Sequence, residues 1–128
     1  MRMCIKLTLL MDLEKLVGEE KLGETREAVF KAFVDMGERI GTVAYRKPEL
    51  GLCTIIYRNS IIRLYIKDNG ITEIKILHSD NNTNIILEDI IKNVVSTITE
   101  ALGTDRDKLD AIALLITPLD TTSYLGTS

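Results

Sequence analysis

The sequence is poor in the residue types that most often carry chemistry. It has one histidine, His78, two cysteines and no tryptophan. A single histidine excludes metal sites built from histidine pairs, and it excludes relays between histidines. His78 ends an apolar run and precedes Ser79 and Asp80, a setting more typical of a surface or half-buried histidine at a strand end than of a catalytic one. We therefore expect a protein that binds rather than catalyses, with no cofactor and no metal.

Long apolar runs are also missing. Lys6 and Asp12 interrupt the first apolar stretch well before the length of about 20 residues that crosses a bilayer, and the first residues lack the pattern of a signal peptide. Cys4 and Cys53 lie in apolar contexts, where reduced, buried thiols are more typical than a disulfide, although the two would pair if their strands were neighbours. These features favour a cytoplasmic protein with no membrane partner.

The composition is that of an ordinary globular domain. With 128 residues, 45% of them hydrophobic and 27% charged, the chain is long enough for one core that needs no metal or disulfide. The formal net charge of −3 argues against attraction of the whole protein to nucleic acid, but it leaves room for a local basic patch. The absence of glutamine fits a thermophilic source, although six asparagines weaken that indication.

Residues 52–78 carry the clearest pattern in the chain. β-branched and aromatic residues fill three runs, and short turn signals at 59–60 and 68–70 separate them. This pattern predicts three antiparallel strands. A two-residue turn at 59–60 sets Tyr57 opposite Ile62, and a three-residue loop at 68–70 gives the third strand a matching register.

Because side chains alternate along a strand, this register decides which of them are buried. The side chains predicted to face the core are those of Cys53, Ile55, Tyr57, Ile62, Leu64, Ile66, Thr72, Ile74 and Ile76. The opposite face then holds Thr54, Ile56, Arg58, Ile61, Arg63, Tyr65, Lys67, Ile71, Glu73, Lys75 and Leu77.

The rest of the chain supplies two further strands and the helices. Alternation predicts strands over residues 1–10 and 42–46, and Asp12 is a candidate N-cap for a short helix. Apolar residues at helical spacing predict a helix from Thr25 to Ile40 and a longer one through Leu87 and Leu102, with a glycine after each.

The last apolar segment is ambiguous. A final helix over 105–116, ended by Pro118, is our prediction. Residues 111–116 are apolar on all sides, which also fits deep packing, a subunit contact or a strand. We expect one domain over 1–118 and a loose tail over 119–128.

The element order is strand, helix, four strands, helix, helix. It predicts an α+β fold in which helices pack on one face of an antiparallel sheet of about five strands. In element order alone, this layout resembles the halves of TATA-binding proteins and a shortened helix-grip fold.

Charge is distributed unequally in the predicted sheet. If residues 1–10 and 42–46 join it with their polar positions outward, the outer face gathers seven basic residues around one acidic residue, Glu73. The basic residues are Arg2, Lys6, Arg46, Arg58, Arg63, Lys67 and Lys75. We therefore expect the outer face of the sheet to be positively charged although the net charge of the protein is negative.

Three functions are compatible with this predicted layout. The leading one is self-association, through an apolar strip on the sheet or through the last helix, giving a homodimer. The second is binding of nucleic acid or another acidic partner by the basic side chains and Tyr65. In the third, a small apolar ligand lies between the sheet and the long helix. A solvated face with no partner is the plain alternative. The strip consists of Ile56, Ile61, Ile71 and Leu77; the partner-binding residues are Arg46, Arg58, Arg63, Tyr65, Lys67 and Lys75.

Overall fold

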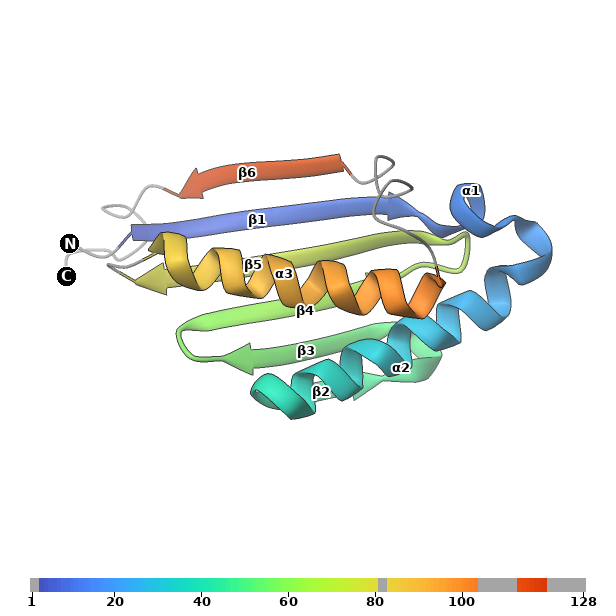
Figure 1. Ribbon diagram of the computed structural model, residues 1–128, viewed down its shortest axis with the longest axis horizontal. Helices are drawn as coiled ribbons and strands as arrows, with labels where there is room; N and C mark the ends of the chain where they lie inside the picture. The colour runs from blue at the N-terminus through green and yellow to red at the C-terminus, as the bar shows by residue number, and fades with distance from the viewer. Residues whose placement is uncertain (1–2, 81–82, 104–112, 120–128) are drawn as a thin grey trace.

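The computed structural model describes residues 3–80, 83–103 and 113–119, which form one antiparallel sheet with helices on one of its faces (Figure 1). The strand order across the sheet is β2-β3-β4-β5-β1-β6. The elements in chain order are β1 (Met3–Asp12), α1 (Leu13–Val17), η1 (Glu19–Lys21), α2 (Leu22–Ile40), β2 (Thr42–Lys47), η2 (Pro48–Leu50), β3 (Leu52–Tyr57), β4 (Ser60–Ile66), β5 (Ile71–Asp80), α3 (Thr83–Leu102) and β6 (Ala113–Leu119). The α+β class and the antiparallel sheet are therefore confirmed.

The core lies between the sheet and the two long helices. Both α2 and α3 cross the same face of the sheet (Figure 1). From α3, Ile90, Val94 and Ile98 are fully buried against the sheet, and Val29 and Phe33 of α2 are equally buried. These side chains form the described part of the core between the sheet and the helices.

The predicted division of the central strands into two faces is confirmed. Every residue assigned to the core face is buried, apart from Tyr57 at the end of β3, which is half-buried. The register of β4 with β5 is the expected one, with Leu64 opposite Ile74. Gly70 in the connecting loop has a φ of 92°, as the three-residue loop requires.

The turn between β3 and β4 lies one residue earlier than predicted. Residues 58–59 form it, and Tyr57 pairs with Ser60. Ser60 belongs to β4 because its hydroxyl is buried beside His78 of β5, and the two side chains are hydrogen-bonded. The pairing moves by two residues, so the same side chains still face inward.

The ends of the first helices are partly as predicted. Asp12 caps α1, and its carboxylate accepts a hydrogen bond from the backbone N–H of Lys15. The expected cap at Thr25 is wrong, because α2 already begins at Leu22 and Thr25 is buried inside it. Gly41 ends the helix as expected.

The predicted final helix is wrong over its last residues. Residues 113–119 form β6, which pairs with β1 and gives the sheet a sixth strand beyond the five expected. A short apolar run fits a strand as well as a helix, and Pro118 is tolerated there because β6 is an edge strand. Self-association through a last helix loses its basis in these residues. Residues 104–112 and the expected tail beyond Leu119 lie outside the described chain.

Candidate functional site

The sheet face opposite α2 and α3, which we call the open face, carries no helix among the described residues (Figure 1). Its side chains come from alternate positions of β1 to β5. Arg63 and Tyr65 are exposed, and Lys67, Glu73 and Lys75 are half-buried. The strand pairing therefore places these five residues where the sequence predicted them.

An irregularity in β2 changes which of its residues join this face. The register shifts between Val43 and Tyr45, so that Ala44 is the extra residue of a β-bulge. Tyr45 pairs with Thr54 and lies on the open face, where strict alternation had placed it on the other side. Lys47 joins the face in the same way. Both residues were missed, because a bulge leaves no clear mark in a six-residue strand.

The bulge also removes Arg46 from the open face. Arg46 pairs with Cys53, a core residue, and its guanidinium lies 3.5 Å from the carboxylate of Glu38 on α2. The prediction of Arg46 as a partner-binding residue on this face is therefore wrong in its placement.

Arg58 is also misplaced by the prediction. It lies in the β3–β4 turn with a φ of 52°, and its guanidinium carbon lies 5.5 Å from the centre of the Tyr57 ring. Tyr57 belongs to the core side of β3, so this cation–π contact turns Arg58 away from the open face. Arg2 lies outside the described residues.

What remains is still a basic surface. Among the described residues, the open face carries five basic side chains and two acidic ones, Glu73 near the centre and Asp12 at the end of β1. Glu73 lies 3.7 Å from the ammonium of Lys67 and 4.0 Å from that of Lys75. It therefore offsets the charge of these two lysines in part. The basic residues are Lys6, Lys47, Arg63, Lys67 and Lys75.

A shallow hollow of about 270 Å³ lies on this face between two tyrosines. Tyr45 and Tyr65 are 45% and 39% exposed, which is unusual for aromatic rings of this size. Arg63, Glu73 and Lys75 line the hollow beside them. The volume is slightly below that of pockets for drug-sized ligands and suits a smaller planar group. Stacking surfaces, hydrogen-bond donors and one carboxylate thus meet at one place.

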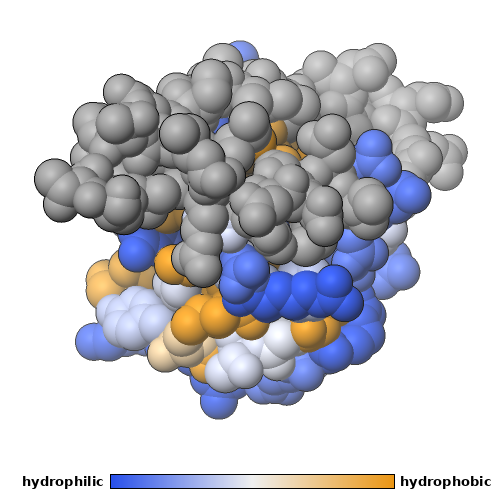
Figure 2. Space-filling view, turned by 90° about the vertical axis from the view of Figure 1, so that its left-hand side faces the viewer, coloured by the Kyte–Doolittle hydropathy of each residue, from blue (hydrophilic) through white to orange (hydrophobic). Residues whose placement is uncertain are grey.

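An apolar row crosses the open face nearer the β3–β4 turn. Ile56 pairs with Ile61, and Ile61 pairs with Leu77, so the three side chains lie side by side on adjacent strands. Figure 2 views this end of the molecule, where hydrophobic residues reach the surface among hydrophilic ones. Ile71, predicted to belong to the same strip, lies at the other end of β5, six residues from Leu77 and about 20 Å away. The predicted strip is therefore divided.

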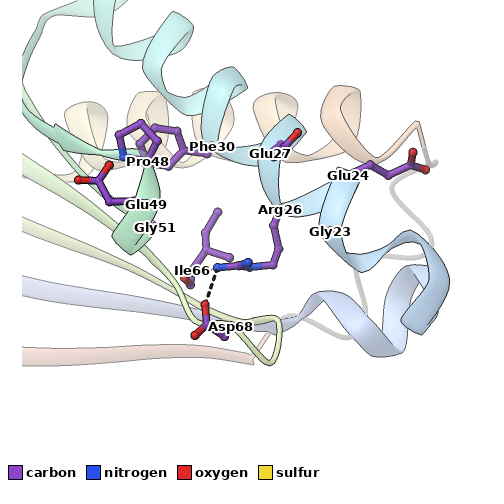
Figure 3. A pocket seen from close by; sticks show the side chains of 10 residues that line it. All are labelled: Gly23, Glu24, Arg26, Glu27, Phe30, Pro48, Glu49, Gly51, Ile66 and Asp68. Atoms are coloured by element: carbon purple, nitrogen blue, oxygen red, sulfur yellow. Dashed lines mark hydrogen bonds and ion pairs between the residues drawn. The ribbon is translucent and has the colours of Figure 1, made fainter.

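A larger cavity than this hollow, of about 590 Å³, lies elsewhere and has the opposite charge (Figure 3). It opens between the start of α2, η2 and the β4–β5 turn. Arg26 crosses it and donates hydrogen bonds to Asp68, at 3.2 Å, and to the carbonyl of Ile66, at 3.4 Å. Four of its ten lining residues are acidic. Arg26 ties the helix to the turn, and the acidic residues make the cavity unsuitable for an anionic ligand.

His78 belongs to the core and not to a catalytic site. It is 2% exposed, and its Nδ1 lies 2.5 Å from the hydroxyl of Ser60, which is 1% exposed. Both side chains are therefore shielded from solvent. Close by, the hydroxyl of Tyr57 donates a 2.9 Å hydrogen bond to Asp89 of α3, and this bond raises the pKa of the tyrosine above its usual range. The Tyr57–Asp89 hydrogen bond joins the sheet to α3, whereas the Ser60–His78 hydrogen bond joins β4 to β5.

Among the described residues, no group of three or more histidine, cysteine, aspartate and glutamate side chains has the arrangement of a metal site. None of the described helices combines the length and the apolar character that crossing a membrane requires.

Comparisons with known proteins add no family to this picture. No family model matches the chain, and a search of curated proteins finds no match either. The open face must therefore be judged on its own chemistry.

Proposed function

We propose that the protein binds single-stranded nucleic acid on the open face of its sheet. The observation that carries the proposal is the pair of exposed tyrosines, Tyr45 and Tyr65, on either side of a hollow lined by Arg63 and Lys75. All four bases can stack on aromatic rings, and Arg and Lys side chains pair with phosphates. A single strand is favoured over a duplex because only unpaired bases expose their faces to such rings.

Charge supports this choice over a second copy of the chain. Basic residues outnumber acidic ones on the open face, so two such faces would repel each other. A polyanion meets no such penalty. The seven charged residues of the open face together carry a formal charge of +3, so the rest of the chain carries −6, and this difference favours approach of a nucleic acid to the open face.

The test is a titration of fluorescently labelled single-stranded RNA, single-stranded DNA and duplex DNA across a salt series. If three of the five basic residues of the open face each neutralise one phosphate, the logarithm of the affinity falls with the logarithm of salt with a slope of about −2. Tyr45→Ala and Tyr65→Ala should each weaken binding by about 10-fold or more, as loss of base stacking does.

The matched charge control lies on α2. Arg63→Glu with Lys75→Glu should abolish most binding at about 50 mM salt, whereas Lys31→Glu with Arg39→Glu, which makes the same charge change on exposed helix positions, should reduce it far less. Equal loss in both double variants, or no binding at low salt, would end the proposal.

Self-association is the second candidate, and the apolar row favours it. Ile56 is 44% exposed beside Ile61 and Leu77, enough to seed a contact with a second copy. Sizing at several concentrations tests this, with Ile56→Asp as the disruptive variant and Ile71→Asp as the same change at the far end of the face. A monomer at all concentrations, or equal effects of both variants, would exclude the row as a dimer contact.

A further inference from the structure

We infer that the hollow between Tyr45 and Tyr65 accepts a guanine base and that Glu73 selects it. This inference rests on the proposed binding of single-stranded nucleic acid. Glu73 lines the hollow, although a carboxylate near the centre of a surface for a polyanion weakens binding of that polyanion. Its presence is explained if the carboxylate recognises part of the ligand.

The position of Glu73 suits that role. It pairs across the strands with Tyr65, so a base stacked on that ring presents its edge to the carboxylate. The side chain is 25% exposed. Its separations from Lys67 and Lys75, 3.7 and 4.0 Å, are those of ion pairs and exceed hydrogen-bond length. Both carboxylate oxygens therefore keep their capacity to accept hydrogen bonds within the described part of the chain.

Guanine fits this arrangement better than the other bases. Its N1–H and N2–H₂ groups are adjacent donors that match the two oxygens of one carboxylate, and its O6 and N7 are acceptors suited to an arginine. Arg63 and Lys75 line the same hollow and supply those donors.

The other bases place an acceptor against the carboxylate. Adenine and cytosine offer one amino group next to a ring nitrogen lone pair, and uracil offers one N–H between two carbonyl oxygens. In each case a carboxylate that accepts one hydrogen bond is repelled by a neighbouring acceptor. The order of preference should therefore place guanine first.

The experiment uses the full chain and a short labelled oligouridylate in which one central position is G, A, C or U. The expected result is binding about tenfold tighter for G than for U. Glu73→Gln should bind all four oligonucleotides more tightly, because a negative charge is lost, and should reduce the preference for G to less than about twofold. Glu49→Gln, the same change outside the open face, should alter neither the affinities nor their ratios.

The outcomes separate the two proposals. If none of the four oligonucleotides binds, the proposed function falls and the inference falls with it. If all four bind the unaltered protein equally, the inference is overturned and the proposed function stands. If Glu73→Gln tightens all four and leaves the preference for G intact, Glu73 only lowers the local charge and the inference is overturned.

Discussion

Individual residues set how closely α2 approaches the sheet. Gly37 faces Ile55 and Val43, and a Cβ at this position would lie 2.6 Å from Cγ1 of Ile55 and 2.9 Å from Cγ2 of Val43. Gly23, in the first turn of the same helix, has no atom within 4 Å of that point. The two glycines of α2 therefore have different effects. Gly37 allows the helix to pack closely against the sheet, whereas Gly23 only lowers the stability of the helix.

Gly37→Ala and Gly23→Ala should shift stability in opposite directions. The first should lower the free energy of unfolding by about 1–3 kcal/mol, because the methyl group forces the buried neighbours to move. The second should raise it by up to about 1 kcal/mol, because alanine favours the helix and restricts the unfolded chain. Urea denaturation of both variants measures the difference. Equal effects would contradict the close approach of α2 to β3.

Cys53 is a second residue whose surroundings have a measurable consequence. It is buried in β3, and burial raises the pKa of its thiol from 9.0 to about 11, an effect that nearby Arg46 partly offsets. Two strands separate β3 from β1, so the alternative of a disulfide with Cys4 is wrong. The thiol remains protonated at neutral pH and is a poor nucleophile.

This pKa predicts a loss of stability in alkali. The unfolded thiol ionises near pH 9 and the folded thiol near 11, so the folded state holds its proton longer and its advantage is lost as pH rises through this range. Between pH 8 and 10 the contribution should fall by about 1 kcal/mol. Denaturant unfolding of the protein and of Cys53→Ala at each pH isolates this contribution. Parallel pH profiles would show that the thiol is not buried as described.

At the scale of elements, regular patterns were predictable and irregular ones were not. Alternation in residues 52–78 identified the buried side chains correctly even though the turn was misplaced, because a shift of two residues preserves the faces. The bulge in β2 shifts parity by one residue, so it exchanged Arg46 for Tyr45 on the open face. One of the two tyrosines that line the hollow was thus hidden from sequence reasoning. The last strand was only an alternative to the predicted helix, because its short apolar run has no period that decides between the two.

The stripe of α3 was the most regular pattern, and it supports a direct test. Ile98 is fully buried on the sheet side, and Ser96 is exposed on the same helix. Ile98→Ala should lower the free energy of unfolding by about 2–5 kcal/mol through lost burial and a cavity, whereas Ser96→Ala should change it by less than about 0.5 kcal/mol. Thermal or urea unfolding provides the comparison. Similar costs at both positions would mean that α3 does not pack as described.

At the scale of the whole molecule, the strand order decides which parts are held on both sides. β5 lies between β4 and β1, and its two pairings extend over most of its length. β2 is an edge strand whose residues are exposed except for half-buried Val43. The β-bulge and the two basic residues of β2 also disfavour pairing of this edge strand with a strand of another chain.

Amide hydrogen exchange should follow this order. Exchange should be slowest in β4 and β5 and should approach the global unfolding rate there, because opening either strand breaks two ladders. The amides of β2 should exchange faster by about tenfold or more. Exchange followed by NMR measures both. Protection in β2 equal to that in β5 would point to a further partner along that edge.

The place of β1 has one more consequence, for synthesis on the ribosome. Residues 3–12 leave the exit tunnel well before both of their neighbours in the sheet, residues 71–80 and 113–119. This apolar segment therefore has no partner strand while about 60 further residues are translated, which takes seconds at about 5–20 residues per second. During that interval a chaperone or the ribosome surface has its best opportunity to hold the nascent chain.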